Sequence, residues 1–199
     1  MDFQFHLVDI SRQRPNGKSV ETATNSWSIS LAAQGKAKEQ SNFDPSREQD
    51  PFLGSCMILN ISAGKDASHI AMDELKKAWQ AAEIELKNAY GNHVETPHRA
   101  LFRTKRGGDV SAGRYFNTET LDYLFVQLGL KLVGVDTPSL EPLNKDQNLL
   151  TQQLSLSRYF LLNLDLADAE SGIVYKLVAP PVVLPGSPLL PVRAILARV

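Results

Sequence analysis

The residues best suited to acid–base chemistry in this sequence are two carboxylates that lie far apart along the chain. Asp136 directly follows the apolar run 131–135, and open α/β sheets tend to hold functional groups where such strands end. Paired with Glu39, it would supply an acid and a base that need no metal. The alternative is structural, with Asp136 anchoring the turn at Thr137 and Pro138 through its own hydrogen bonds.

Metal chemistry has few candidate ligands, because the chain contains only four histidines. His93 and His98 flank Glu95 just ahead of an apolar segment, and this arrangement can be read either as a metal site or as a polar loop. Serine hydrolase chemistry is not indicated, because the sequence contains no GxSxG motif.

The composition is that of an ordinary globular protein. The 199 residues are 43% hydrophobic and 22% charged, with no apolar run long enough to span a bilayer. A net charge of −1 gives no general attraction for nucleic acid or for a membrane surface. Cys56 is the only cysteine and lies in an apolar run, so we expect a buried structural thiol. The sequence starts without a charged leader and a long apolar stretch, so we expect a cytoplasmic protein.

Hydrophobic periodicity predicts strands and helices in alternation. Strands are expected at residues 3–10, 27–31, 55–61, 99–104, 131–136, 159–164, 175–178 and 192–197. One helix should run from an N-cap at Ser68 to a stop at Gly91, and a second from an N-cap at Asn117 to Gly129. Residues 32–50 lose all apolar periodicity, which indicates a long loop. The sequence therefore predicts a single α/β domain over residues 1–199 with a mixed sheet.

Four segments, in order, resemble the cyclase family that contains bacterial kynurenine formamidases. They are LFRT at 101–104, NTETLDYLFVQLGLKLVGVDTPSLEPL at 117–143, FLLNLDL at 160–166 and IVYKLVAPPVVLPGSPLLPVRAIL at 173–196. The N-terminal third is similar to the family only through VDIS at 8–11 and FLGSCMIL at 52–59. The resemblance implies a swivelling β/β/α fold, a homodimer or higher homo-oligomer, and hydrolysis of amides such as N-formylkynurenine with a pair of divalent cations.

The resemblance also implies where the metal ligands should be, and the residues there are of other types. The family takes its ligands from an HxGxHxD segment and from a downstream His and Glu. Matching the glycine to Gly35 sets Ala33 and Ala37 at the histidines and Glu39 at the aspartate. The downstream His falls within 149–153, where Gln152 and Gln153 stand, and the Glu corresponds to Leu162. Methyl and isobutyl groups have no lone pair to offer a metal, so we expect no metal and no other cofactor.

Three hypotheses about function follow from this resemblance. The first is a pseudoenzyme, in which loop 32–50 replaces the metal-binding segment and the protein binds or regulates, with a small molecule or a homologous protein as partner. The second is a metal-independent hydrolase, lyase or cyclase that uses Glu39 and Asp136. The third is an arylformamidase with a displaced metal site, supplied by His93, His98 or a neighbouring subunit. The pocket of the second would be lined by the following residues: Trp27, Ala33, Ala37, Gln152 and Leu162.

Overall fold

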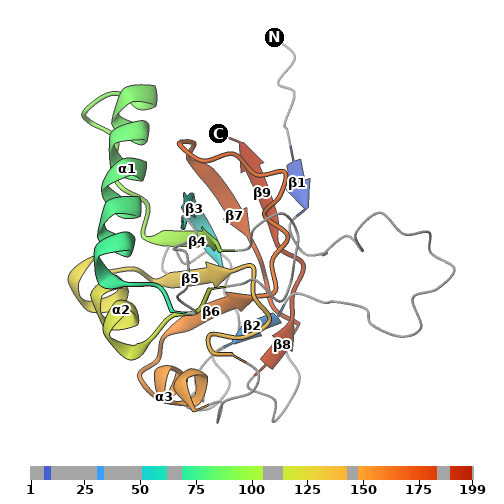
Figure 1. Ribbon diagram of the computed structural model, residues 1–199. Coiled ribbons are helices and arrows are strands. Elements are labelled where there is room, and N and C mark those ends of the chain that lie inside the picture. Colours follow the sequence, from blue (N-terminus) through green and yellow to red (C-terminus); the bar gives the residue numbers. More distant parts are fainter. Residues whose placement is uncertain are drawn as a thin grey trace, which may run out of the picture.

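The computed structural model describes residues 7–9, 31–33, 51–61, 69–104, 114–142, 148–182 and 189–198. Within these ranges the strands form one sheet in the order β1-β9-β7-β3-β4-β5-β6-β2-β8 (Figure 1). The strands are β1 (Leu7–Asp9), β2 (Leu31–Ala33), β3 (Leu53–Asn60), β4 (Arg99–Arg103), β5 (Leu132–Val135), β6 (Tyr159–Leu162), β7 (Tyr175–Val178), β8 (Leu189–Pro191) and β9 (Ile195–Arg198). The helices are α1 (Met72–Tyr90), α2 (Thr118–Asp122), which continues into the π-helical turn η3 (Tyr123–Gln127), and α3 (Leu149–Ser155).

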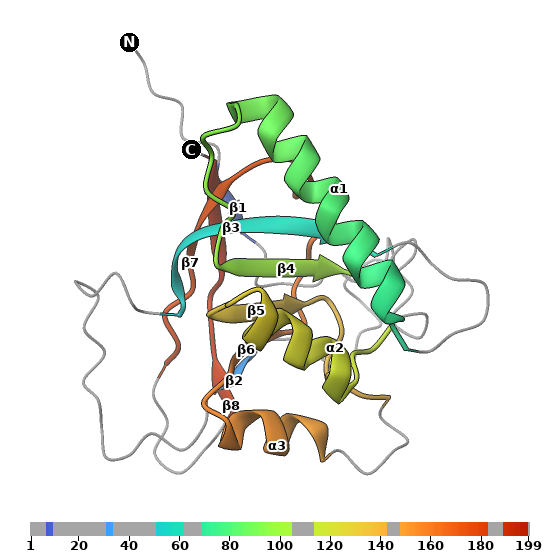
Figure 2. The same ribbon diagram turned by 90° about the vertical axis from the view of Figure 1, so that its left-hand side faces the viewer.

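The sheet is mixed, as predicted. Strands β3, β4, β5 and β6 run parallel to one another in the middle, and the remaining pairs are antiparallel. The crossovers between the parallel strands carry α1, α2 and α3, which lie in front of the sheet in Figure 2. Because these helices cover one face, the parallel strands are buried there and need apolar residues on that side.

The core consists of two apolar layers, one on each side of the parallel strands. Alternate residues of one strand enter opposite layers, since side chains in a strand have a period of two. In β6, Phe160 and Leu162 belong to the layer under the helices, whereas Leu161 belongs to the layer on the other face. Gly134 of β5 is required by this packing, because a Cβ there would lie 2.3 Å from Leu101 Cδ2.

Helix α1 buries Leu75, Trp79, Ala82 and Leu86 along one face and ends at Gly91, as predicted. Its start differs from the prediction. The N-cap is Ala71, and Ser68, the expected N-cap, lies outside the described residues.

The start of α1 is held by a charged side chain from a distant segment. Glu74 Oε2 accepts hydrogen bonds from the Ala71 backbone N–H at 3.0 Å and from Arg114 Nη2 at 2.6 Å. Arg114 is 4% exposed and also donates to the His69 carbonyl at 2.7 Å. The buried Arg114 guanidinium therefore holds Glu74 in position to accept from the Ala71 N–H, which stabilises the helix start as a capping serine would.

The second predicted helix has the expected N-cap. Asn117 Oδ1 accepts from the Thr120 backbone N–H at 2.9 Å, and Gly129 follows the helix with a φ of 65°. The last turn widens into η3, which the sequence pattern did not indicate.

Two elements were not predicted, and several predicted segments have different limits, such as 192–197, where the strand is Ile195–Arg198. Helix α3 has no side-chain cap hydrogen bond at Asn148, and β8 has three residues, so both lacked a clear sequence signal. Strand β2 continues to Ala33, two residues into the predicted loop 32–50. Residues 27–30 of the predicted strand lie outside the described residues. None of the described helices is long and apolar enough to cross a bilayer.

We predict that Cys56 does not react with a thiol reagent in the native protein. The side chain is fully buried in β3, and burial raises the pKa of its thiol to about 12, although the charge of Arg99 opposes this. Labelling at pH 8 with a chromogenic disulfide should be negligible in buffer and should reach one thiol per chain in denaturing guanidinium. Rapid native labelling would contradict the burial of Cys56.

We also predict that Glu74 makes stability depend on pH in the acid range. The hydrogen bond from Arg114 lowers the pKa of the Glu74 carboxyl below 4.5, its ordinary value. Its contribution is therefore complete above the unfolded-state pKa and is lost as pH falls through the folded-state pKa. Glu74→Gln should cost about 1 kcal/mol at pH 7, because the carboxylate is partly exposed.

The same substitution should make the free energy of unfolding, measured by urea denaturation, fall less between about pH 5 and pH 3 than it does in the wild type. Glu95→Gln, in an exposed loop, is the control and should leave the profile unchanged. If Glu74→Gln and the wild type lose stability in parallel over this window, the Glu74–Arg114 interaction does not have this role.

Candidate functional site

The predicted site residues fall partly outside the described structure. Trp27, Ala37 and Glu39 lie outside the described residues, whereas Ala33 and Leu162 are the last residues of β2 and β6. These two strands pair antiparallel, with Leu31 opposite Leu162 and Ala33 opposite Phe160. Positions 33 and 162 are therefore diagonal neighbours on one ladder, about 7 Å apart.

Leu162 occupies the position that the resemblance assigns to a metal-binding glutamate. It is 1% exposed and belongs to the apolar layer under the helices. A lone carboxylate in these surroundings would be costly, because nothing apolar can pair with its charge. Leucine fills the position with apolar volume and offers no metal ligand.

The two glutamines of α3 have different surroundings. Gln152 is exposed, whereas Gln153 is 1% exposed and its Oε1 accepts a short hydrogen bond from Arg158 Nη1. The same Arg158 nitrogen lies 2.6 Å from Asp122 Oδ1. The guanidinium also stands over the Phe125 ring, 5.1 Å from its centroid. The Gln153 amide oxygen is thus bonded to a cation, which disfavours coordination of a second one.

The sequence did not indicate Arg158 as a functional or structural residue. It lies in the connection between α3 and β6, and α3 itself was not predicted. Its partners Asp122 and Gln153 come from α2 and α3, so only the packing of those two helices brings the group together.

Asp136 lies at the carboxyl end of β5, as predicted, and accepts hydrogen bonds from Thr104, which directly follows the neighbouring strand β4. It is 3% exposed, and its Oδ2 accepts from the Thr104 backbone N–H at 2.9 Å. Its Oδ1 accepts from Thr104 Oγ1 at 2.6 Å. At the predicted turn, Thr137 Oγ1 donates to the Ser139 carbonyl at 2.8 Å. The carboxylate therefore joins the ends of β4 and β5.

Backbone hydrogen bonds continue this edge to β6. Asn163 follows β6 with a φ of 61° and is 7% exposed. Its N–H donates to the Thr137 carbonyl at 2.8 Å, and the next N–H, of Leu164, donates to Val135 at 3.0 Å. A left-handed conformation at a buried residue other than glycine persists only where neighbouring contacts fix it.

The histidines that suggested a displaced metal site do not gather into one. His93, Glu95 and His98 are all exposed. Within the described ranges, no group of three or more His, Cys, Asp or Glu side chains is placed to hold a metal ion. At the described ligand positions of the resemblance, Leu162 and Gln153 do not fit a divalent metal, for the reasons given above. No reaction step is therefore assigned to a metal.

Comparison with known proteins relates the chain to a kynurenine formamidase. No protein-family model matches the chain. The chain is 30% identical over 156 residues to the kynurenine formamidase of Bordetella avium. The match includes 74% of this chain and 64% of the relative, so the chain spans less than two thirds of that protein's length.

Solved structures share the fold over nearly the whole chain. A potential metal-dependent hydrolase with cyclase activity superposes with a TM-score of 0.61 at 13% identity, covering 98% of this chain and 99% of that one. Isatin hydrolase A from Labrenzia aggregata, bound to benzyl benzoate, gives 0.60 at 14% identity, with 98% and 94% covered. These likenesses show the cyclase-like α/β fold that the sequence predicted. Together with the kynurenine formamidase relative, they support a cyclase-like family for this chain.

Proposed function

We propose that this protein is a pseudoenzyme of the cyclase-like family, which binds or regulates and does not hydrolyse amides with a metal. The observation that carries the proposal is Leu162, buried in an apolar layer where the resemblance expects a glutamate ligand. A metal-binding carboxylate at this depth is tolerable only while the cation is present. Leucine is the replacement expected once no cation has to be held.

The bonding of two further polar groups supports the same proposal. Gln153, in the segment of the expected histidine, has its amide oxygen bonded to Arg158. Asp136, the candidate base of the metal-independent alternative, has both carboxylate oxygens bonded to Thr104. A general base must reach the proton that it removes, and these bonds favour a structural carboxylate.

The proposal extends to the partner and the assembly. The kynurenine formamidase relative suggests two kinds of partner, a small molecule related to that enzyme's substrate or a homologous protein. We further propose a cytoplasmic protein that forms a homodimer or a higher homo-oligomer. A protein of this kind would act by binding its ligand or partner, because it would have no metal-activated water with which to hydrolyse an amide.

The first test is metal content together with hydrolysis. Protein purified without chelators should contain far less than one zinc, manganese or iron per chain by elemental analysis. It should not hydrolyse N-formylkynurenine above the buffer rate, with the Bordetella avium kynurenine formamidase as the active control. Stoichiometric metal with turnover would defeat the proposal.

The second test asks whether Asp136 stabilises the fold. Asp136→Asn removes the charge that strengthens two buried hydrogen bonds, so it should lower the free energy of unfolding by about 1.5–3 kcal/mol. Combined with Thr104→Val, the loss should be less than additive, with a coupling of about 0.5–3 kcal/mol. Thr151→Val, on the exposed side of α3, is the matched control and should change stability by less than about 0.5 kcal/mol. Additive losses would show that the two side chains do not act together.

A further inference from the structure

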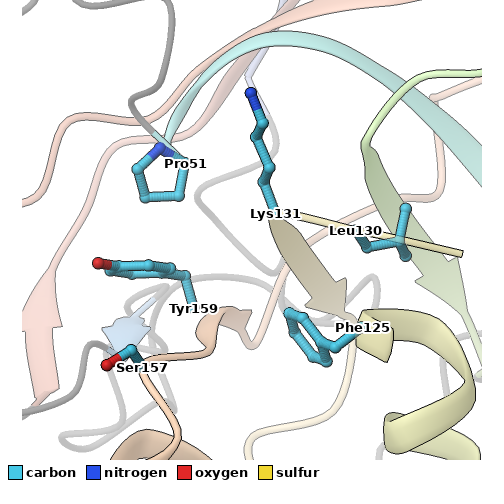
Figure 3. Close-up of a pocket in the computed structure, with 6 residues that line it drawn as sticks. All are labelled: Pro51, Phe125, Leu130, Lys131, Ser157 and Tyr159. Carbon is cyan, nitrogen blue, oxygen red and sulfur yellow. The ribbon is translucent and has the colours of Figure 1, made fainter. Parts of the chain in front are cut away.

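A groove of about 400 Å³ opens at the edge of the sheet where the parallel strands begin. Figure 3 shows Pro51 and Tyr159 on one side and Phe125 and Leu130 on the other, with Lys131 between them. The residues that line the groove are the following: Pro51, Phe125, Leu130, Lys131, Ser157 and Tyr159. The volume is within the range of small-molecule sites, which are about 300–1,000 Å³.

The groove lies at the opposite end of the parallel strands from the carboxyl edge that holds Asp136 and Leu162. Lys131 and Ser157 precede β5 and β6, whereas Asp136 follows β5 and Leu162 ends β6. No residue of the predicted pocket lines it. The inference from this groove therefore does not rest on the loss of the metal site, and a chain that bound metal would leave it unaffected.

The walls of the groove are fixed by packing. Tyr159 packs edge-on against Phe52 with 5.7 Å between ring centroids, and Phe125 packs in the same way on Phe160 at 5.4 Å. Pro51 is held by its carbonyl, which accepts from Arg99 Nε at 2.8 Å. A groove with walls already in place costs little ordering when a ligand binds.

The charges around the groove favour an anion. Lys131 lines it with an exposed side chain, and its backbone is fixed by a hydrogen bond from its N–H to the His98 carbonyl at 2.7 Å. Two arginines contact lining residues: Arg99 donates to the Pro51 carbonyl, and Arg158 lies over the Phe125 ring. Arg158 is paired with the Asp122 carboxylate. Lys131 is a cation on the lining itself, where it favours an anionic ligand.

We propose that this groove binds a small aromatic carboxylate. The ring would lie against the apolar side chains of Pro51, Leu130 and Tyr159, and the carboxylate would meet the ammonium of Lys131. A neutral ring gains only the apolar part of this interaction, and an aliphatic anion gains only the charge.

The test uses phenylacetate as the probe, with phenylacetamide and acetate as its neutral and ring-free counterparts. The full chain, labelled with ¹⁵N, is titrated with each and followed by amide chemical shifts. Phenylacetate should shift Lys131, Ser157 and Tyr159 saturably, whereas acetate should not. Lys131→Gln should weaken phenylacetate binding about three- to fivefold, as expected for an exposed ion pair. It should leave phenylacetamide binding unchanged.

Lys176→Gln is the matched control, because Lys176 is an exposed lysine on β7, a strand that contributes no residue to the groove. It should bind phenylacetate as the wild type does. The proposal is overturned if phenylacetate shifts no groove residue, if its shifts map elsewhere, or if Lys131→Gln binds it unchanged. It is equally overturned if the groove resonances move with protein concentration alone, because a second copy of the chain would then be the occupant.

Discussion

The burial of the parallel strands on both faces is the constraint on which the rest of this structure depends. Strands β4 and β5 are almost wholly buried, as are the middle of β3 and most of β6. No water reaches these positions, so a polar group there needs a partner within the protein. The consequence is visible at the strand ends, where a buried polar residue such as Asp136 is bonded to a neighbouring element.

This constraint explains why a carboxylate is stable at position 136 of the carboxyl edge and why an apolar residue is stable at position 162. Asp136 remains a carboxylate because Thr104 bonds both of its oxygens. Leu162, two strands away from Thr104 in the same sheet, packs among the apolar side chains of the described core. A glutamate at that position would be stable only with a cation beside it, so in the proposed pseudoenzyme the leucine and the lack of a cation would be physically linked.

Buried arginines follow the same logic elsewhere in the fold. Arg114 is bonded to Glu74 and Arg158 to Asp122 and Gln153. Arg99 fits only because residue 54 is glycine, since a Cβ there would lie 2.6 Å from its Nη1. Gly54 also has a φ of 136°, which side-chain-bearing residues rarely adopt. These cations join segments that are distant in sequence, so they stabilise the tertiary arrangement more than any single element.

Hydrophobic periodicity predicted the elements with long, regular patterns and strong stop signals, such as α1 with Gly91 and the strand Tyr175–Val178. It missed α3 and β8, because seven and three residues are too short for a period to be distinguished. It placed Asp136 correctly at a strand end but not its partner, because the register that brings Thr104 beside it is a property of the folded sheet. Arg158 was missed for the same reason.

The most direct test of the central claim is thermal unfolding of the full chain with EDTA and then with excess zinc or manganese. A metal that binds the native state raises the melting temperature by an amount that grows with the logarithm of its free concentration over its Kd. If the carboxyl edge holds no cation, the melting temperature should be the same with chelator and with either metal. A melting temperature that rises with metal concentration in this way would contradict this account.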